Sequence, residues 1–128
     1  KEFECAPQDI ICCICPSIRK CHFEVDKDVK DMFEKEFYDL KNVKFFDIEK
    51  ENRETTIQLT DFIEEKIKNV KWNIDTVLIN KILLQQEGLM AQNVIDSGIC
   101  SVCHSDRIHS YRIEKKAYNT ETAIIELK

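Results

Sequence analysis

Cysteine, histidine and arginine side chains are concentrated in residues 97–112 of the sequence. Cys100 and Cys103 form a Cys-x-x-Cys pair, and His104 and His109 follow it closely. Two thiolates at this spacing can share one tetrahedral metal ion, and imidazoles can complete its coordination. These four residues are therefore candidate zinc ligands, and one hypothesis for the chain is a small non-enzymatic zinc-binding module.

Other chemistry fits the same residue types. Residues 100–104 also match the Cys-x-x-Cys-His pattern of covalent haem attachment, but that reaction requires an exported protein and no leader segment is visible. A cysteine activated by a histidine could act as a nucleophile, although the sequence singles out no one cysteine. Arg19, Arg107 and Arg112 could bind a phosphate or carboxylate through paired hydrogen bonds, or form surface ion pairs.

The pattern of apolar residues predicts the elements that would position these side chains. Residues 9–14 are mostly apolar, which is typical of a strand buried on both faces. Apolar residues at helical spacing predict a surface helix within residues 25–40, with Asp26 and Asp28 at its start. Aromatic and β-branched residues at 43–48 favour a strand.

The second half of the chain contains further helix and strand signals. A second helix is predicted over residues 60–70, and a third starts at Asp75 and ends near Gly88, where a left-handed residue fits. Short strands are predicted at 93–96, 107–113 and 122–127. Together these elements predict an α+β fold, with mixed β-sheets flanked by about three helices.

Composition limits the classes of function. The chain has 128 residues, of which 43% are hydrophobic and 34% charged, as in one ordinary folded domain. Its net charge of −5 disfavours a nucleic-acid or anionic-membrane surface, since such surfaces are basic. No apolar run reaches the roughly 18 residues of a membrane span. We expect a cytoplasmic protein that binds neither nucleic acid nor membrane.

The cysteines do not suggest a disulfide framework. There are seven of them, an odd number, and Cys12, Cys13 and Cys15 share one short run. Neighbouring residues of a strand point to opposite faces, so these three cannot all pair. We expect reduced cysteines, most of them buried as small apolar side chains.

Two segments resemble the laccase-domain (YfiH-type) family. Residues 14–25, I-C-P-S-I-R-K-C-H-F-E-V, resemble the family block I-G-P-x-I-x-x-C-C-[YF]-E-V. Further along, Cys100-x-x-Cys103 and Ser110-Tyr111-Arg112 resemble the later pattern C-T-x-C followed by F-x-S-Y-R-R. The order and spacing of these segments agree along nearly the whole chain.

The resemblance implies a YfiH-like α+β fold and a purine-nucleoside-processing enzyme. Family members carry out phosphorolysis of adenosine and inosine, some deaminate adenosine, and an older name is polyphenol oxidase. The substrates would be a purine nucleoside and phosphate, with Arg19, Cys21 and Arg112 as candidate substrate contacts. The loops at residues 16–22 and 100–109 would line the pocket.

The resemblance also implies a zinc or copper ion held by a His–Cys–His set. In the family these ligands lie in motifs such as C-A-D-C and H-A-G-W-R-G, and neither motif occurs in this sequence. Residues 1–128 are therefore expected to be the C-terminal part of one laccase-type domain, which is incomplete and carries no catalytic residue of its own. On this view the chain alone has little or no activity and could self-associate through unpaired sheet edges.

The sequence departs from the family pattern at several positions. Cys15 replaces the glycine of G-P, Ser101 the threonine of C-T, and Ile113 the second arginine of S-Y-R-R. Asn119-Thr120 replaces a late Gly-Arg pair. Loss of two arginines weakens the expectation that an anionic substrate group is held from this side.

Overall fold

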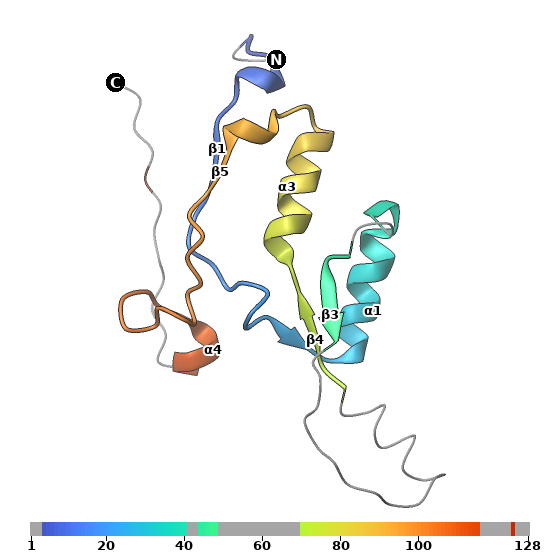
Figure 1. Cartoon of the computed structure of the whole chain (residues 1–128), viewed down its shortest axis with the longest axis vertical. Coiled ribbons are helices and arrows are strands. Elements are labelled where there is room, and N and C mark those ends of the chain that lie inside the picture. Colours follow the sequence, from blue (N-terminus) through green and yellow to red (C-terminus); the bar gives the residue numbers. More distant parts are fainter. Residues whose placement is uncertain (1–3, 41–43, 49–69, 116–123, 125–128) are drawn as a thin grey trace, which may run out of the picture. The chain divides into compact units, whose positions relative to one another are not determined.

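The chain divides into two compact units in a computed structural model that describes residues 4–40, 44–48, 70–115 and 124. Unit 1 comprises Lys1–Arg19 and Val77–Lys128, and unit 2 comprises Lys20–Thr76. Figure 1 shows the course of the chain through both. Among the described residues, no helix is long and apolar enough to cross a membrane.

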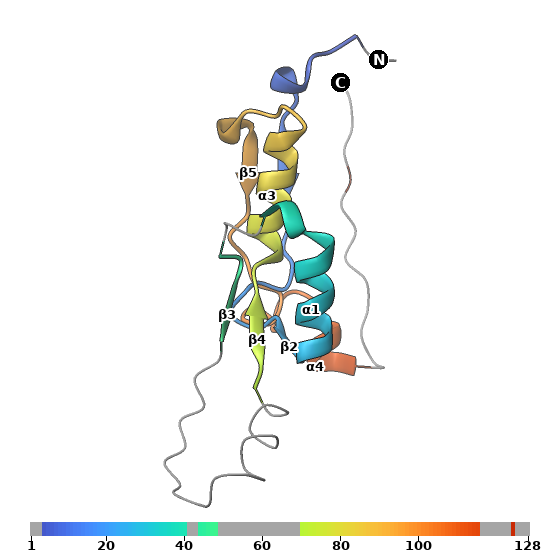
Figure 2. The same ribbon diagram turned by 90° about the vertical axis from the view of Figure 1, so that its right-hand side faces the viewer.

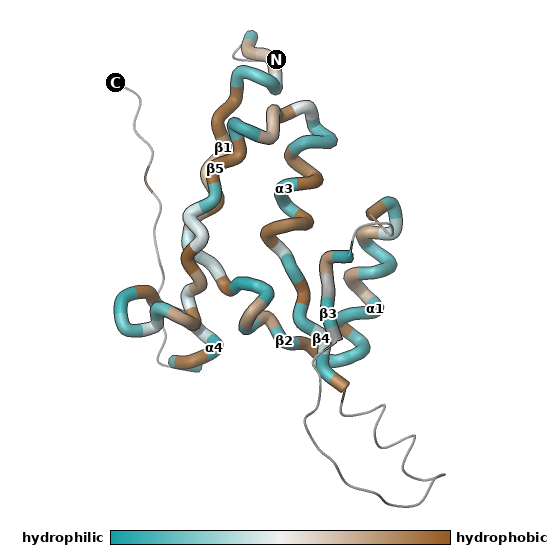
Figure 3. The backbone as a smooth tube through the Cα atoms, viewed as in Figure 1, coloured by the Kyte–Doolittle hydropathy of each residue, from teal (hydrophilic) through white to brown (hydrophobic). Residues whose placement is uncertain are grey.

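Unit 1 is built on a parallel pair of short strands, which lie side by side in Figure 1. Strand β1 (Cys12–Ile14) pairs with β5 (Val94–Asp96), with Cys12 opposite Val94 and Ile14 opposite Asp96. Short 3₁₀ turns at Pro7–Asp9 and Ala91–Asn93 precede the two strands. Figure 3 shows hydrophobic residues along both strands.

The parallel pairing continues beyond the strands. Ser17 forms a bridge with Cys100: the Ser17 N–H donates to the Ile99 carbonyl (3.3 Å) and the Ser101 N–H donates to the Ser17 carbonyl (3.0 Å). The chain then makes a series of turns through residues 101–107 and forms the short helix α4 (Tyr111–Glu114). The Cys-x-x-Cys pair therefore starts on a backbone that is held to the end of β1.

Unit 2 is a three-stranded antiparallel sheet with one helix. Its strand order is β2 (Glu24–Val25), β4 (Trp72–Ile74), β3 (Phe46–Ile48). Helix α1 (Lys27–Glu36) lies beside the sheet in Figure 2 and is followed by a 3₁₀ turn at Tyr38–Leu40.

The core of unit 2 is largely aromatic. Phe45 is 2% exposed and Ile74 is fully buried. Ring contacts run from Phe23 to Phe33, Phe37 and Phe45, with centroids 6.2, 5.7 and 6.4 Å apart in turn. Such tilted and edge-on pairs add to the stabilisation that burial provides. This core holds the segment that precedes β2, which contains Cys21 and His22.

The α+β class is confirmed, with helices and with both parallel and antiparallel sheets. The strand predicted at residues 93–96 is β5, and the one at 43–48 contains β3. Helix α1 ends at Glu36, before the predicted end, and its first residue follows Asp26. The helix predicted at 60–70 lies outside the described residues, as does the strand at 122–127 except for Ile124.

Three expectations are wrong. Residues 107–113 are not a strand: they leave the turn and enter α4, because the Ser110 carbonyl accepts the N–H groups of Ile113 and Glu114. Strand β1 is not buried on both faces, since Cys13 is exposed and β5 is its one partner among the described strands. Most of the cysteines are not buried: of the seven, Cys100 is buried, Cys12 is half-buried and the other five are exposed.

Helix α3 (Thr76–Gln86) starts directly after Asp75, and Gly88 ends it as predicted. The Gly88 N–H donates to the Gln85 carbonyl (3.0 Å) and the Leu89 N–H to the Leu84 carbonyl (3.1 Å), the two bonds of a Schellman motif. Gly88 has φ of +94°, which side chains rarely adopt.

Replacing Gly88 by alanine should destabilise unit 1 by about 1–2 kcal/mol, the usual cost of a left-handed conformation. The new Cβ would also lie 3.1 Å from the Cβ of Pro7. Gly98→Ala is the matched control, because Gly98 has φ of +68° but nothing within 4 Å of an added Cβ. Hydrogen exchange of the β5 amides measures the loss of stability in both variants. Equal losses would show that the contact with Pro7 adds nothing to the cost of Gly88→Ala.

Candidate functional site

Arg19 joins the end of β1 to the segment that follows β5. Its Nε donates to the Ile99 carbonyl (3.0 Å) and its Nη2 to Ser97 Oγ (2.9 Å), while its Nη1 lies 2.7 Å from Asp96 Oδ1. Nη2 also approaches the Cys15 carbonyl at 3.4 Å. The Arg19 side chain is only 12% exposed. Its guanidinium is therefore used in holding these two segments together.

Asp96 is the acidic centre of this network. Besides Arg19, it accepts a hydrogen bond from the Gly98 N–H (3.0 Å) and forms an ion pair with Lys81 Nζ (2.9 Å). The Gly98 N–H, Lys81 and Arg19 together lower the pKa of Asp96 from 3.8 to about 2. A carboxylate that accepts several donors prefers its charged form. Asp96 thus stays ionised and keeps Arg19 in place.

The three candidate anion-binding arginines have different surroundings. Arg19 is committed to protein acceptors, so an anion that bound it would compete with Asp96. Arg112 is exposed on α4. Arg107 is exposed and lies 3.3 Å from Asp106. Arg112 belongs to the family-like Ser110-Tyr111-Arg112, and this resemblance makes it the candidate for a direct anion contact, whereas Arg19 holds the segment that contains its acceptors.

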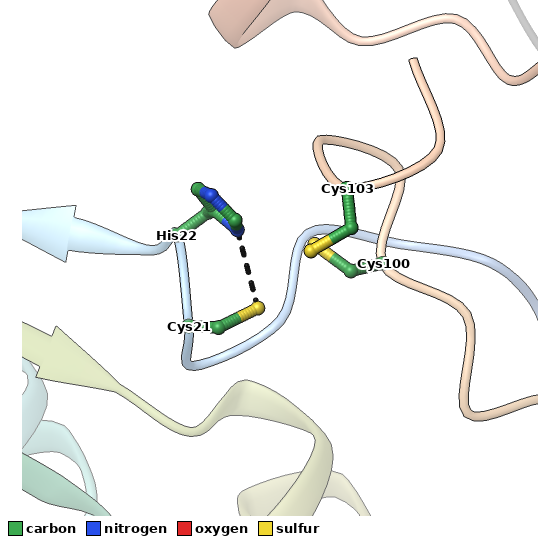
Figure 4. Close-up of side chains that lie close together, drawn as sticks. All are labelled: Cys21, His22, Cys100 and Cys103. Carbon is green, nitrogen blue, oxygen red and sulfur yellow. Dashed lines mark hydrogen bonds between the residues drawn. The ribbon is translucent and has the colours of Figure 1, made fainter. Parts of the chain in front are cut away.

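The structure brings the sulfur atoms of Cys100 and Cys103 close together. Their Sγ atoms lie within 4.8 Å of each other, and Figure 4 shows both side chains. Cys100 is 4% exposed, whereas Cys103 is exposed on the turn. The His104 N–H donates to the Cys100 carbonyl (3.1 Å), which closes the turn between the two cysteines. This arrangement is a chelating thiol pair with one buried and one accessible sulfur.

The two histidines of the segment are held by other groups. His104 Nδ1 lies 3.1 Å from the Cys100 carbonyl oxygen. His109 Nδ1 lies 3.0 Å from a carboxylate oxygen of Glu114. Within the described part of unit 1, no third Cys, His, Asp or Glu ligand atom joins the two sulfurs. Four residues were expected as zinc ligands. Within the described part of unit 1, the donor atoms of the two cysteines lie close together and those of the two histidines do not join them.

Unit 2 contains a second soft donor pair. Cys21 Sγ and His22 Nδ1 are 3.2 Å apart, as the dashed line in Figure 4 marks, and both residues are exposed. The turn that holds them is fixed on both sides: Asn73 Nδ2 donates to the Lys20 carbonyl (2.9 Å) and the Ile74 N–H to the Phe23 carbonyl (3.1 Å). Cys21, a candidate substrate contact, thus has an imidazole beside its thiol.

The sequence patterns did not predict the contacts around Asp96. One local signal was present: Asp96-Ser97-Gly98 can form a turn in which the aspartate accepts the N–H two residues later, and it does so here. The contribution of Lys81 and Arg19 had no local signal, because Arg19 lies 80 residues from its acceptor Ile99.

A family model described as multi-copper polyphenol oxidoreductase laccase matches residues 1–128. The chain belongs to this family. The crystal structure of the Bacillus licheniformis hypothetical protein YfiH has a similar fold, with a TM-score of 0.61 and 21% sequence identity. The likeness covers 88% of this chain but only 35% of YfiH, so the laccase-family chain spans about a third of that protein. No curated protein matches the chain.

Proposed function

We propose that this laccase-family chain forms part of an enzyme that processes purine nucleosides, by phosphorolysis of adenosine or inosine or by deamination of adenosine. The match of the family model to residues 1–128 is the observation that carries the proposal. The resemblance of residues 14–25 and 110–112 to the purine-nucleoside-processing members supports it.

Residues of this chain would contribute to binding the substrate, some directly and one indirectly. Arg112 is an exposed cation on α4 and would contact phosphate, since a guanidinium binds phosphate through two parallel hydrogen bonds. Arg19 would act indirectly, by fixing the segment from Asp96 to Ile99. Cys21 stays a candidate substrate contact in unit 2.

The family name and the resemblance imply a copper or zinc ion, and the residues of neither unit fit a catalytic centre. A catalytic zinc site takes three protein ligands and keeps one position open. Among the described residues, the donor atoms gathered within unit 1 are the two sulfurs of Cys100 and Cys103, and those within unit 2 are one sulfur and one imidazole nitrogen. We propose that the catalytic ligands lie outside residues 1–128.

Nucleoside binding by the whole chain tests this proposal. We expect saturable binding of inosine and phosphate, measured by NMR titration, and a roughly tenfold weaker phosphate affinity in Arg112→Ala, as charged hydrogen bonds contribute about 1.5–3 kcal/mol. Arg107→Ala is the matched control, because Arg107 is an exposed arginine of the same segment.

Three outcomes would contradict the proposal. Absence of nucleoside binding, or equal phosphate affinity in Arg112→Ala and the native chain, would remove the substrate role. Robust phosphorolysis of inosine by the 128-residue chain would show that its catalytic ligands lie within it.

We propose a small non-enzymatic zinc-binding module as the alternative function. It is favoured by the closeness of the Cys100 and Cys103 sulfurs. It predicts stoichiometric zinc that survives gel filtration, unfolding upon chelation, and no binding of nucleosides.

A further inference from the structure

We propose that Cys100 and Cys103 together bind a thiophilic d10 cation, Zn²⁺ or Cu⁺, at a site distinct from the catalytic metal of the family. The inference does not depend on nucleoside processing. It requires a suitable distance between the sulfurs, a backbone that holds them, and a path by which the ion can enter.

The distance is suitable. Zinc–sulfur bonds are about 2.3 Å long, so two sulfurs on one tetrahedral zinc ion lie about 3.8 Å apart. The Cys100 and Cys103 sulfurs already lie within 4.8 Å. Rotation of the exposed Cys103 side chain is therefore enough to chelate an ion, and the backbone need not move.

The backbone on the Cys100 side is held by contacts that do not involve the sulfurs. Ser17 bridges to Cys100, and Arg19 Nε donates to the carbonyl of Ile99. The turn after Cys103 is closed by the N–H groups of Arg107 and Ile108, which both donate to the His104 carbonyl (3.0 and 2.9 Å). A site that is held in this way loses little conformational freedom when it binds an ion.

The surroundings of the two sulfurs also favour binding. Cys103 is exposed and gives an ion access from solvent. Soft thiolates select soft or borderline cations such as Cu⁺ and Zn²⁺ over Mg²⁺ or Ca²⁺.

Cu⁺ and Zn²⁺ differ in the number of ligands that they require. Two thiolates satisfy Cu⁺, whereas Zn²⁺ takes four ligands. In unit 1, further zinc ligands would come from His104 and His109, whose Nδ1 atoms lie beside the Cys100 carbonyl and the Glu114 carboxylate. Within the described part of unit 1 neither imidazole lies with the two sulfurs, so each would have to turn toward them to bind zinc.

The test is metal binding by the reduced whole chain, with Zn²⁺ and Cu⁺ titrated separately against chromogenic chelators. We expect 1:1 binding, and losses of more than about 100-fold in affinity in Cys100→Ser and in Cys103→Ser, since removal even of outer-shell partners costs about 10–100-fold. Cys13→Ser is the control, because Cys13 is also an exposed free cysteine. Cys103 is exposed, so its variant should fold even if Cys100→Ser does not.

Cobalt gives a second readout, since thiolate-to-Co²⁺ charge-transfer bands report sulfur ligation directly. Weaker Zn²⁺ binding in His104→Ala and His109→Ala would support a zinc site, and Cu⁺ binding unaffected by these changes would support a two-thiolate copper site. Unchanged affinity for both ions in Cys103→Ser would overturn the proposal, and the absence of the charge-transfer bands together with absent Cu⁺ binding would do the same. Neither result would bear on nucleoside binding.

Discussion

Replacing Arg19 by alanine is expected to lower the free energy of unfolding of unit 1 by about 3 kcal/mol, since breaking a largely buried ion pair typically costs about 3–5 kcal/mol. The change removes donors to Asp96, Ser97 and Ile99 together. Lys81 would still neutralise part of the Asp96 charge, which places the effect at the lower end of the range.

Hydrogen exchange of the β1 and β5 amides measures this effect within unit 1. Arg107→Ala is the matched control: its ion pair with Asp106 is 82% and 70% exposed, and such pairs contribute little. If both substitutions changed exchange equally, Arg19 would not be the link between β1 and the segment after β5.

Arg19→Ala should also weaken metal binding at Cys100 and Cys103. Ile99, whose carbonyl accepts from Arg19, directly precedes Cys100. Loss of Arg19 should therefore loosen the backbone on the Cys100 side of the thiol pair. This effect is indirect, so it should be smaller than the loss caused by removing either sulfur.

Helix α3 and the end of β5 were predictable because their signals are local. Gly88 ends the helix through hydrogen bonds to residues within one turn, and the glycine is visible in the sequence. Strands β2 and β4 were not recognised, because two or three residues are too few to show a period. Their existence depends on pairing between segments far apart in the chain.

The incorrect strand at residues 107–113 shows how a local polar contact overrides a period-two pattern. Glu114 Oε1 accepts from the Ser110 N–H (2.9 Å), and this side-chain contact favours a helical turn over extension. The same carboxylate contacts His109. Glu114 follows Ser110 by four residues, one more than in a capping box, and the Ser110 side chain forms no cap hydrogen bond, so this turn had no standard signal in the sequence.

The candidate site was predictable to the extent that it is local. Cys100 and Cys103 lie two residues apart, so their sulfurs could be expected to meet. The role of Arg19 could not be expected in the same way, since its acceptors Ser97 and Ile99 lie 78 and 80 residues away. Arginine as a ligand for an external anion and arginine as an internal link look alike in a sequence.

Acidification tests the network through Asp96 itself. The folded pKa of about 2 lies below the ordinary value of 3.8, because the Gly98 N–H, Lys81 and Arg19 favour the carboxylate. The ionised form therefore contributes its full stabilisation above about pH 4, and this contribution is lost as the pH falls from about 4 through about 2. The difference in pKa corresponds to about 2 kcal/mol.

The expected result is a difference in stability between the native chain and Asp96→Asn that is largest near neutral pH and shrinks towards about pH 2. Hydrogen exchange of the β5 amides over this range measures it. Asp106→Asn serves as control, because Asp106 is 70% exposed and its ion pair contributes little. A difference that stayed constant down to about pH 2 would mean that the asparagine disturbs packing, and that the charge of Asp96 does not hold Arg19.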